Sequence, residues 1–201
     1  PELAREVEEL RQRDQATGLL NRQTFMRLLE DAVAVVGRDG GQYGFLLVEP
    51  DHYARLLPDI GLDSADALAA ALAERVRGAL DPDVRTARFG EHSFAVLLEG
   101  NHARTRAAAD ALRHAFSAEV LAVGERSLAV TASIGGVQVG EKIASVAQVL
   151  AKASQCQAAA VELGGNTVQL FDPGAADRAE EERIALWVAR IREALAGEGF
   201  V

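Results

Sequence analysis

Apolar residues recur at helical spacing in long stretches of this chain, and short unbroken apolar runs stand between those stretches. The helical spacing predicts helices over 1–13, 22–36, 63–80, 102–120, 145–163 and 176–196. The short runs, bounded by turn residues, predict strands over 45–49, 126–139 and 167–171, with a β-hairpin over 85–99. Long helices between strands, together with one hairpin, indicate an α+β fold in which helices wrap a central, mostly antiparallel sheet.

Capping and breaking residues refine these boundaries. Asn21 is the expected N-cap of the second helix, and Asp63 or Ser64 is that of the third. The segment 50–62 contains two prolines and a glycine, so it is expected to be irregular. The glycine pair at 135–136, inside a long predicted strand, predicts a β-bulge.

Composition narrows the classes of function. Hydrophobic residues make up 49% of the 201 residues, which is enough for a sizeable core and excludes wholesale disorder. The formal net charge of -9 disfavours nonspecific binding to nucleic acid or to an anionic membrane, although a single nucleotide could still bind in a local basic pocket. A single cysteine provides no internal disulfide framework, and no apolar run has the length of a membrane span. We therefore expect a cytoplasmic domain without nucleic-acid or membrane partners.

The tip of the predicted hairpin carries the candidate chemistry. It places a glycine, an acid, an imidazole, a hydroxyl and an aromatic ring in succession, at Gly90, Glu91, His92, Ser93 and Phe94. Together with four other segments, this tip resembles the motifs of GGDEF domains, the diguanylate cyclase family. The five segments read "DQATGLLNR" (14–22), "FLLVEPDHYARLLPDIGLDSAD" (45–66), "RFGEHSFAVLL" (88–98), "VTASIGG" (130–136) and "GGNTVQLFD" (164–172). No single motif is specific, but five in register identify the family.

The resemblance implies a fold, an activity and a set of ligands. GGDEF domains are related in fold to nucleotide cyclases and the polymerase palm. A dimer of them condenses two GTP molecules, one held by each domain, into cyclic di-GMP. Carboxylates hold Mg²⁺, which polarises the phosphate and assists the attacking 3′-hydroxyl. A glycine-lined hairpin lets the backbone approach the nucleotide, and Lys and Arg bind the terminal phosphates.

Several nucleotide contacts that the resemblance implies are replaced in the segment 45–66. Glu49 stands where the family has the first metal-binding aspartate and could still bind Mg²⁺, whereas Ala54 replaces a lysine. Leu57 replaces the asparagine that reads the guanine edge, and Asp66 retains the second guanine contact. Leucine cannot supply the hydrogen bonds of the asparagine and places an apolar group against a polar base edge.

The hairpin tip departs from the family in the same direction. Gly90 and Phe94 are retained, but Glu91 replaces the second glycine and is expected to bring negative charge toward the phosphates. His92 replaces the metal-binding acid, and imidazole is a poor ligand for Mg²⁺, which prefers oxygen. Ser93 replaces the glutamate that follows.

The phosphate-binding cations and the inhibitory site of the family are also missing. Val161 stands in place of a lysine and Gly165 in place of an arginine. Asp81 and Val84 occupy the two positions of the inhibitory R-x-x-D motif, so cyclic di-GMP is not expected to bind there. Losing three contacts at about 1.4 kcal/mol each lowers an affinity roughly a thousandfold. We therefore predict a degenerate domain with no catalytic residues, no metal, no cofactor, and no strong binding of GTP or cyclic di-GMP.

Three functions stay open on the sequence. The favoured one is a regulatory or interaction module that acts as a relay or scaffold for an unidentified protein partner. The second is a GTP-binding domain that modulates an adjacent domain, which Glu49 and Asp66 favour and the replaced contacts oppose. The third is an active cyclase with an atypical signature. A transition-metal site at Glu49, His52 and His92 is disfavoured, because their spacing matches no ligand motif.

The flanking helices predict the organisation of a longer protein. Residues 1–13 form a signalling or linker helix that lies on the domain or pairs in a coiled coil, 14–173 form the degenerate GGDEF domain, and 174–201 form a connector helix. The final "RIREALAGEGFV" resembles the connector that precedes the EAL phosphodiesterase domain of tandem GGDEF–EAL proteins. We therefore expect a sensor domain before this chain and an EAL domain after it. The arrangement is similar to that of FimX-type proteins, which control type IV pili and twitching motility.

Overall fold

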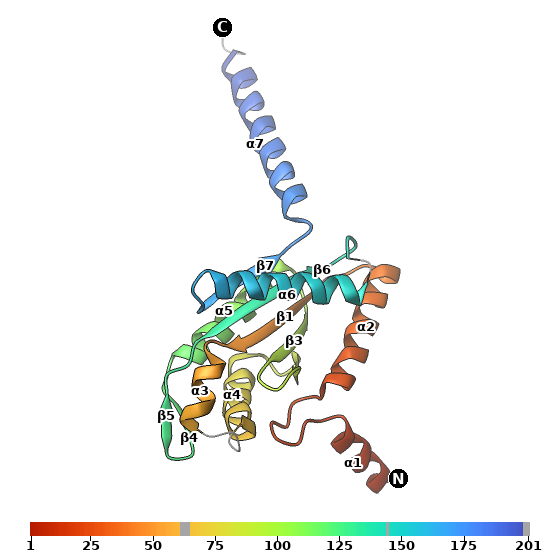
Figure 1. Ribbon diagram of the computed structural model, residues 1–201. Helices are drawn as coiled ribbons and strands as arrows, with labels where there is room; N and C mark the ends of the chain where they lie inside the picture. The colour runs from red at the N-terminus through yellow and green to blue at the C-terminus, as the bar shows by residue number, and fades with distance from the viewer. Residues whose placement is uncertain (61–64, 144, 199–201) are drawn as a thin grey trace. The chain divides into compact units, whose positions relative to one another are not determined.

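Figure 1 shows the computed structural model of the chain, which describes residues 1–60, 65–143 and 145–198. The side chains at 57–60, 176–178 and 198 lie outside that description. The chain divides into two compact units, Pro1–Phe171 and Asp172–Val201, and each is described by itself.

The first unit combines helices with a five-stranded sheet. Its helices are α1 (Glu2–Arg11), α2 (Arg22–Asp39), α3 (Tyr53–Ile60), α4 (Ala65–Ala79), α5 (His102–Ser117) and α6 (Val146–Glu162). The sheet is built from β1 (Tyr43–Pro50), β2 (Arg85–Arg88), β3 (Phe94–Glu99), β6 (Ala132–Val139) and β7 (Thr167–Phe171). The strand order is β2-β3-β1-β6-β7, and every neighbouring pair is antiparallel except β6 and β7. The predicted α+β fold with a mostly antiparallel central sheet is confirmed.

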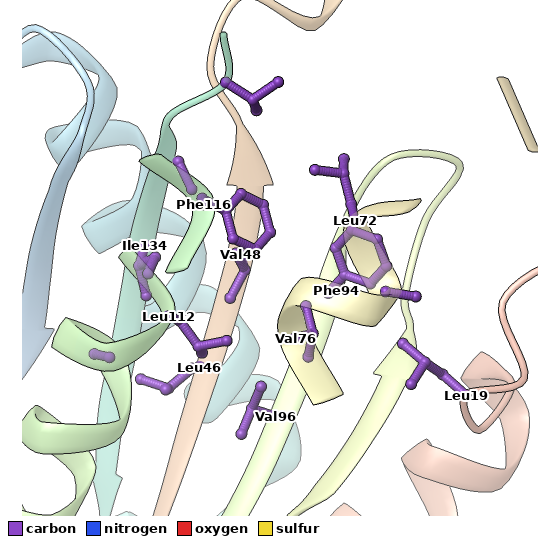
Figure 2. Packing of buried hydrophobic residues seen from close by; sticks show 14 of the residues in the cluster. Leu19, Leu46, Val48, Leu72, Val76, Phe94, Val96, Leu112, Phe116 and Ile134 are labelled. Atoms are coloured by element: carbon purple, nitrogen blue, oxygen red, sulfur yellow. The ribbon is translucent and has the colours of Figure 1, made fainter. Parts of the chain in front are cut away.

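The sheet separates two apolar layers because side chains alternate along its strands. In β1, Leu46 and Val48 belong to the layer formed with α4 and α5, whereas Phe45 and Leu47 belong to the layer formed with α2 and α6. Figure 2 shows the first layer, which includes the fully buried Phe94 of β3. A strand that is buried on both faces needs apolar residues at every position, which explains its unbroken apolar run.

Most predicted elements are present, with ends shifted by a few residues. Asn21 caps α2 as predicted, since its side chain accepts a hydrogen bond from the Thr24 N–H at 2.9 Å. The hairpin predicted over 85–99 is formed by β2 and β3. The caps expected at Asp63 or Ser64 lie outside the described residues.

Helix α3 corrects the expectation that 50–62 is irregular. The helix continues through Pro58, which cannot donate a backbone hydrogen bond. Tyr53 and Leu56, one turn apart, pack against the larger apolar layer. Burial of these two side chains offsets the lost hydrogen bond, so the proline does not prevent the helix.

A small second sheet corrects the strand predicted over 126–139. Strands β4 (Leu121–Val123) and β5 (Arg126–Leu128) form an antiparallel hairpin, and its turn contains Gly124 with a φ of 60°. Residues 129–131 are not in a strand, and regular structure resumes in β6. The apolar pattern continues from β5 into β6, although β5 pairs with β4 and β6 pairs with β1 and β7. The pattern therefore could not show that two strands are present.

The glycine pair in β6 does not form the predicted bulge. Residues 135–136 pair with β1 in unbroken register. A Cβ atom on Gly135 would collide with the backbone of α6, lying 2.6 Å from the Cα atom of Gln157 and closer still to the carbonyl oxygen of Ala153. The glycine is required by the close approach of helix and strand backbones.

The two terminal helices expose apolar side chains. Helix α1 has no buried residue, and Leu3 and Leu10 are among its exposed side chains. In the second unit, α7 (Ala175–Glu198) exposes Ile184 and Trp187. Among the helices that the structure describes, none combines the length and apolar character needed to cross a membrane.

Candidate functional site

A cavity of about 320 Å³ brings the hairpin tip together with the ends of β1 and α6. The described residues that line it are Glu49, Pro50, Asp51, His52, Tyr53, His92, Gln157, Val161, Gly164 and Gly165. Four of the predicted site residues, far apart in sequence, therefore share one cavity: Glu49, His92, Val161 and Gly165.

His92 lies flat against Tyr53 on the wall of this cavity. The ring centroids are 3.9 Å apart and the ring planes differ by 14°. The Tyr53 hydroxyl and His92 Nδ1 are buried and have no hydrogen-bond partner among the described residues. Burial raises the pKa of the Tyr53 hydroxyl, and the negative charge of Glu91 raises it further. The residue at the position of a metal-binding acid thus packs against α3.

Glu49 connects the end of β1 to α6. Its Oε2 accepts a hydrogen bond from Gln157 Nε2 at 2.9 Å. Its second carboxylate oxygen has no hydrogen-bond partner among the described residues. Val161, one helical turn after Gln157, is 52% exposed at the cavity and provides no positive charge. The cavity therefore has a carboxylate in its lining, and the position where the resemblance implies a phosphate-binding lysine is apolar.

Asp51 is a structural carboxylate that the sequence analysis missed. The hydroxyls of Thr131 and Ser133 each donate to it at 2.6 Å, and the Asn166 N–H donates at 2.8 Å. Asp51 thereby joins the end of β1 to the start of β6 and to the turn before β7. Its position two residues after Glu49, in the sequence "EPD", could have marked Asp51 as a site residue. Both of its oxygens are engaged by the protein.

Gly165 lies directly against the Asp51 carboxylate. Its φ is 77°, and a Cβ atom there would lie 2.8 Å from Asp51 Cγ. Any side chain at this position is strained by both the backbone conformation and the contact. An arginine at 165 would therefore require the turn to move.

The backbone of the hairpin tip folds tightly on itself. The Phe89 and Gly90 N–H groups both donate to the Ser93 carbonyl, at 2.8 and 3.2 Å. A Cβ atom on Gly90 would lie 2.5 Å from Ser93 Oγ, and Phe94 is fully buried where β3 begins. Glu91 is exposed and is not among the described residues that line the cavity. Its charge therefore acts on the site from outside, whereas the sequence suggested that it would occupy the phosphate region.

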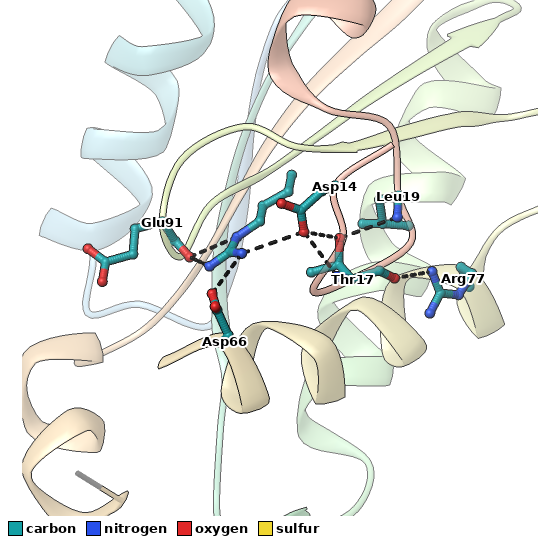
Figure 3. A network of polar contacts seen from close by, with 7 residues as sticks. Asp14, Thr17, Leu19, Asp66, Arg77 and Glu91 are labelled. Atoms are coloured by element: carbon teal, nitrogen blue, oxygen red, sulfur yellow. Dashed lines mark hydrogen bonds and ion pairs between the residues drawn. The ribbon is translucent and has the colours of Figure 1, made fainter. Parts of the chain in front are cut away.

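Arg88 links separate segments beneath the tip (Figure 3). Its Nη1 donates to Asp66 Oδ1 at 3.0 Å and lies 3.5 Å from Asp14 Oδ2, while its Nε and Nη2 donate to the Glu91 carbonyl. The Asp66 carboxylate, expected to read guanine, is thus paired with a guanidinium, and Asp66 is not among the described lining residues of the cavity. The side chain of Leu57, expected beside it, lies outside the described residues.

The loop before α2 completes this network. Asp14 Oδ2 accepts hydrogen bonds from the Thr17 N–H at 3.0 Å and from the Thr17 hydroxyl at 2.8 Å. Arg77 of α4 donates to the Thr17 carbonyl at 2.7 Å. The opening motif "DQATGLL" therefore acts structurally, because it clamps the loop between the hairpin and α4.

Replacing Arg88 with alanine is expected to lower the free energy of unfolding by about 2 kcal/mol, because several charge-assisted hydrogen bonds are lost. The Arg88 side chain is only 12% exposed, so water screens these contacts weakly. Urea denaturation measures the loss. The control is Arg85→Ala on the same strand, at an exposed position, for which a change within about 0.5 kcal/mol is expected. Equal losses in both variants would contradict the role assigned to Arg88.

The positions of the inhibitory motif lie before β2. The Val84 N–H donates to the Asp81 carbonyl at 3.1 Å, which closes a turn. Arg104 of α5 pairs with Asp83 at 2.8 Å and with Asp81 at 3.7 Å. The nearby guanidinium is therefore already engaged by the acids of this turn.

In the described part of the chain, no three His, Cys, Asp or Glu side chains lie closely enough together to hold a metal ion. Glu49, His52 and His92 line the same cavity, yet they do not form such a group. The disfavoured transition-metal site therefore gains no support.

The mostly antiparallel sheet, its helical layers and the motif-bearing hairpin define a domain of the nucleotide-cyclase and polymerase-palm type. The family model described as "Diguanylate cyclase, GGDEF domain" matches residues 11–167. The chain therefore belongs to the GGDEF-domain family of cyclic di-GMP signalling.

Three proteins of Pseudomonas aeruginosa illustrate the similarity. Diguanylate cyclase DgcP is 32% identical over 136 residues, which cover 65% of this chain and 20% of DgcP. Cyclic di-GMP phosphodiesterase NbdA is 28% identical over 177 residues, covering 84% of this chain and 22% of NbdA. The crystal structure of the FimX GGDEF domain superposes with a TM-score of 0.73 at 28% identity, covering 80% of this chain and 98% of that domain. The chain thus spans about a fifth of the two full-length relatives.

Proposed function

We propose that this domain is catalytically inactive and acts as a regulatory and protein-interaction module in cyclic di-GMP signalling. The cavity carries the proposal. His92, at the position of the metal-binding acid, is stacked on Tyr53, and Val161 and Gly165 stand where the phosphate-binding cations would be. None of the described lining residues is Lys or Arg. The phosphates of GTP would therefore meet no cationic side chain in this part of the protein.

A second candidate is a GTP-binding domain that regulates an adjacent EAL domain. The persistence of a cavity with Glu49 at its base favours this function. The pairing of Asp66 Oδ1 with Arg88 at 3.0 Å opposes it, because guanine would compete with a guanidinium for the same carboxylate. An active cyclase is the weakest candidate, since it would need to catalyse the reaction without an acid at position 92.

The setting of the domain in a longer protein is part of the proposal. Matches that span a fifth of a diguanylate cyclase and of a cyclic di-GMP phosphodiesterase support a place among other domains. We propose a sensor domain before residue 1, an EAL domain after α7, and a cytoplasmic location. The similarity to the FimX GGDEF domain supports a FimX-type role in type IV pilus and twitching motility control.

The purified domain is expected to form no cyclic di-GMP from GTP and Mg²⁺, and to bind GTP roughly a thousandfold more weakly than a domain that retains these contacts. Calorimetric titration measures the binding, and chromatography of the same mixture detects the product. An active GGDEF domain provides the positive control. Micromolar binding without product would favour the second candidate, and product would refute the proposal.

A restored signature sharpens this test. The triple variant Glu91→Gly, His92→Asp and Ser93→Glu rebuilds the family motif at the hairpin tip. It is expected to remain inactive, because Val161 and Gly165 still supply no cation for the phosphates. If this variant forms cyclic di-GMP and the unmodified domain does not, the hairpin tip limits activity and the phosphate positions do not.

A further inference from the structure

We infer that the cavity between the hairpin tip and α6 binds a guanidinium group, supplied by an arginine side chain of a protein partner. The inference deepens the proposed function, because it names the chemistry by which an interaction module would hold its partner. It rests on that proposed function for the source of the arginine. The charge, the hydrogen-bonding groups and the rim of the cavity each support it.

The charge of the cavity has the sign that a cation requires. Glu49 and Asp51 bring two carboxylates to the lining, and the described lining residues include no Lys or Arg. Asp51 is engaged by Thr131, Ser133 and the backbone of the turn before β7, so Glu49 is the carboxylate left for a ligand. The lining therefore offers a carboxylate to a cationic ligand and, among the described residues, no cation to a phosphate.

Two side-chain oxygens of the lining are left as hydrogen-bond acceptors. Gln157 donates through Nε2 to Glu49, which leaves the Gln157 amide oxygen and the second Glu49 oxygen as acceptors. The Tyr53 hydroxyl and His92 Nδ1 are themselves buried, so neither adds an acceptor that a ligand in the cavity could reach. A guanidinium offers five N–H donors and no acceptor, so it complements this set, whereas a phosphate offers only acceptors.

The rings at the wall favour a planar cation over an ammonium. Tyr53 and His92 form a flat stacked pair in the lining. A guanidinium stacks on aromatic faces, and its fork of donors matches a carboxylate, whereas an ammonium is a compact and strongly hydrated charge.

The rim of the cavity suits a protein partner. Val161 is 52% exposed and Leu163, two residues later, is 68% exposed. Exposed apolar residues beside a charged pocket allow a partner to exclude water around one buried arginine, and arginine is enriched at interface hot spots. The cavity volume of about 320 Å³ is at the small end of the range of about 300–1,000 Å³ for ligand sites, which suits a single side chain.

NMR titration of the chain with Nα-acetyl-L-arginine N-methylamide, in buffer with EDTA, tests the inference. We expect saturable shifts at Glu49, Gln157 and His92 with a millimolar Kd, since a lone side chain buries little surface. The corresponding lysine compound should bind about tenfold more weakly. The neutral citrulline compound should not bind measurably.

Variants locate the site. Glu49→Gln should weaken arginine binding at least about tenfold, because a charge-assisted hydrogen bond is lost. Glu125→Gln makes the same change of charge in the exposed β4–β5 turn and should leave the Kd unchanged. Val161→Lys, at an exposed rim position, should abolish binding by placing a cation at the cavity. Amide spectra of the free variants check that each is folded.

Two results would overturn the inference. Shifts that do not saturate, or that persist in Glu49→Gln, would show general attraction to an acidic surface. Saturable binding of agmatine, a free guanidinium compound, without binding of the capped arginine would exclude a protein side chain as the ligand. Both results concern arginine binding only. Whether the domain is catalytically inactive is decided separately, by the assay for cyclic di-GMP formation from GTP.

Discussion

Replacing Gly135 with alanine is expected to lower the free energy of unfolding by about 3 kcal/mol, the upper part of the range for overpacked cores. A Cβ atom at this position would lie 2.6 Å from the Cα atom of Gln157, and backbone atoms of α6 cannot rotate away as a flexible side chain can. The helix must therefore shift off the sheet. Because α6 also carries Gln157 and Val161, the shift would open the cavity.

Urea denaturation of the variant and of the parent chain measures this loss. The matched control is Gly37→Ala near the end of α2, where an added Cβ atom meets no heavy atom within 4 Å. That change should stabilise the domain by up to about 1 kcal/mol, because alanine favours helix more than glycine does. A loss below about 1 kcal/mol for Gly135→Ala would mean that helix and strand have room between them.

Replacing Asp51 with alanine is expected to cost about 3 kcal/mol, since hydrogen bonds to a charged group contribute about 1.5–3 kcal/mol and their donors would be left unpaired. The donors are the hydroxyls of Thr131 and Ser133, each at 2.6 Å, and the Asn166 N–H at 2.8 Å. They come from two separate segments, the start of β6 and the turn before β7. Their loss should therefore release the turn before β7 from the end of β1.

The control for Asp51→Ala is the other carboxylate of the same cavity. Glu49→Gln retains an oxygen acceptor near Gln157 and is expected to change the free energy of unfolding by less than about 1 kcal/mol. Asp51→Asn should give an intermediate loss, because one of the two acceptor oxygens remains. Thermal and urea unfolding of the three variants measure the three losses in free energy of unfolding and so give their order. A larger loss for Glu49→Gln than for Asp51→Ala would reverse the roles assigned to the two acids.

Together these contacts separate the residues that support the fold from those that would bind a nucleotide. Asp14, Asp51 and Arg88 make hydrogen bonds that hold the fold together. Several positions that the resemblance marks as departures from the family, namely Glu49, His92, Val161 and Gly165, line the cavity. The domain can therefore retain its architecture while the chemistry of its site changes.

Much of the fold follows from local properties of the sequence. Apolar spacing predicted the long helices because a helix on a sheet must bury one face. The Asn21 cap was predictable because it satisfies backbone N–H groups within its own turn. The five motifs identified the family, and the residue types alone show which of its positions are replaced.

Other features depend on partners distant in sequence, and only the tertiary structure decided them. Helix α3 forms through Pro58 because Tyr53 and Leu56 meet an apolar layer built by other elements. Gly135 in β6 reflects the close approach of α6, and the glycine pair forms no bulge.

In the candidate site, too, some features follow from the sequence and others only from tertiary contacts. By itself the sequence determined the family and the architecture, and it predicted that Lys and Arg are lost from the phosphate positions. The tertiary structure decided that His92 stacks on Tyr53, that Arg88 pairs with Asp66, and that Asp51 is structural. The reason is physical: residue types limit the chemistry a site can perform, but hydrogen bonding and burial depend on which groups the folded chain brings within contact distance.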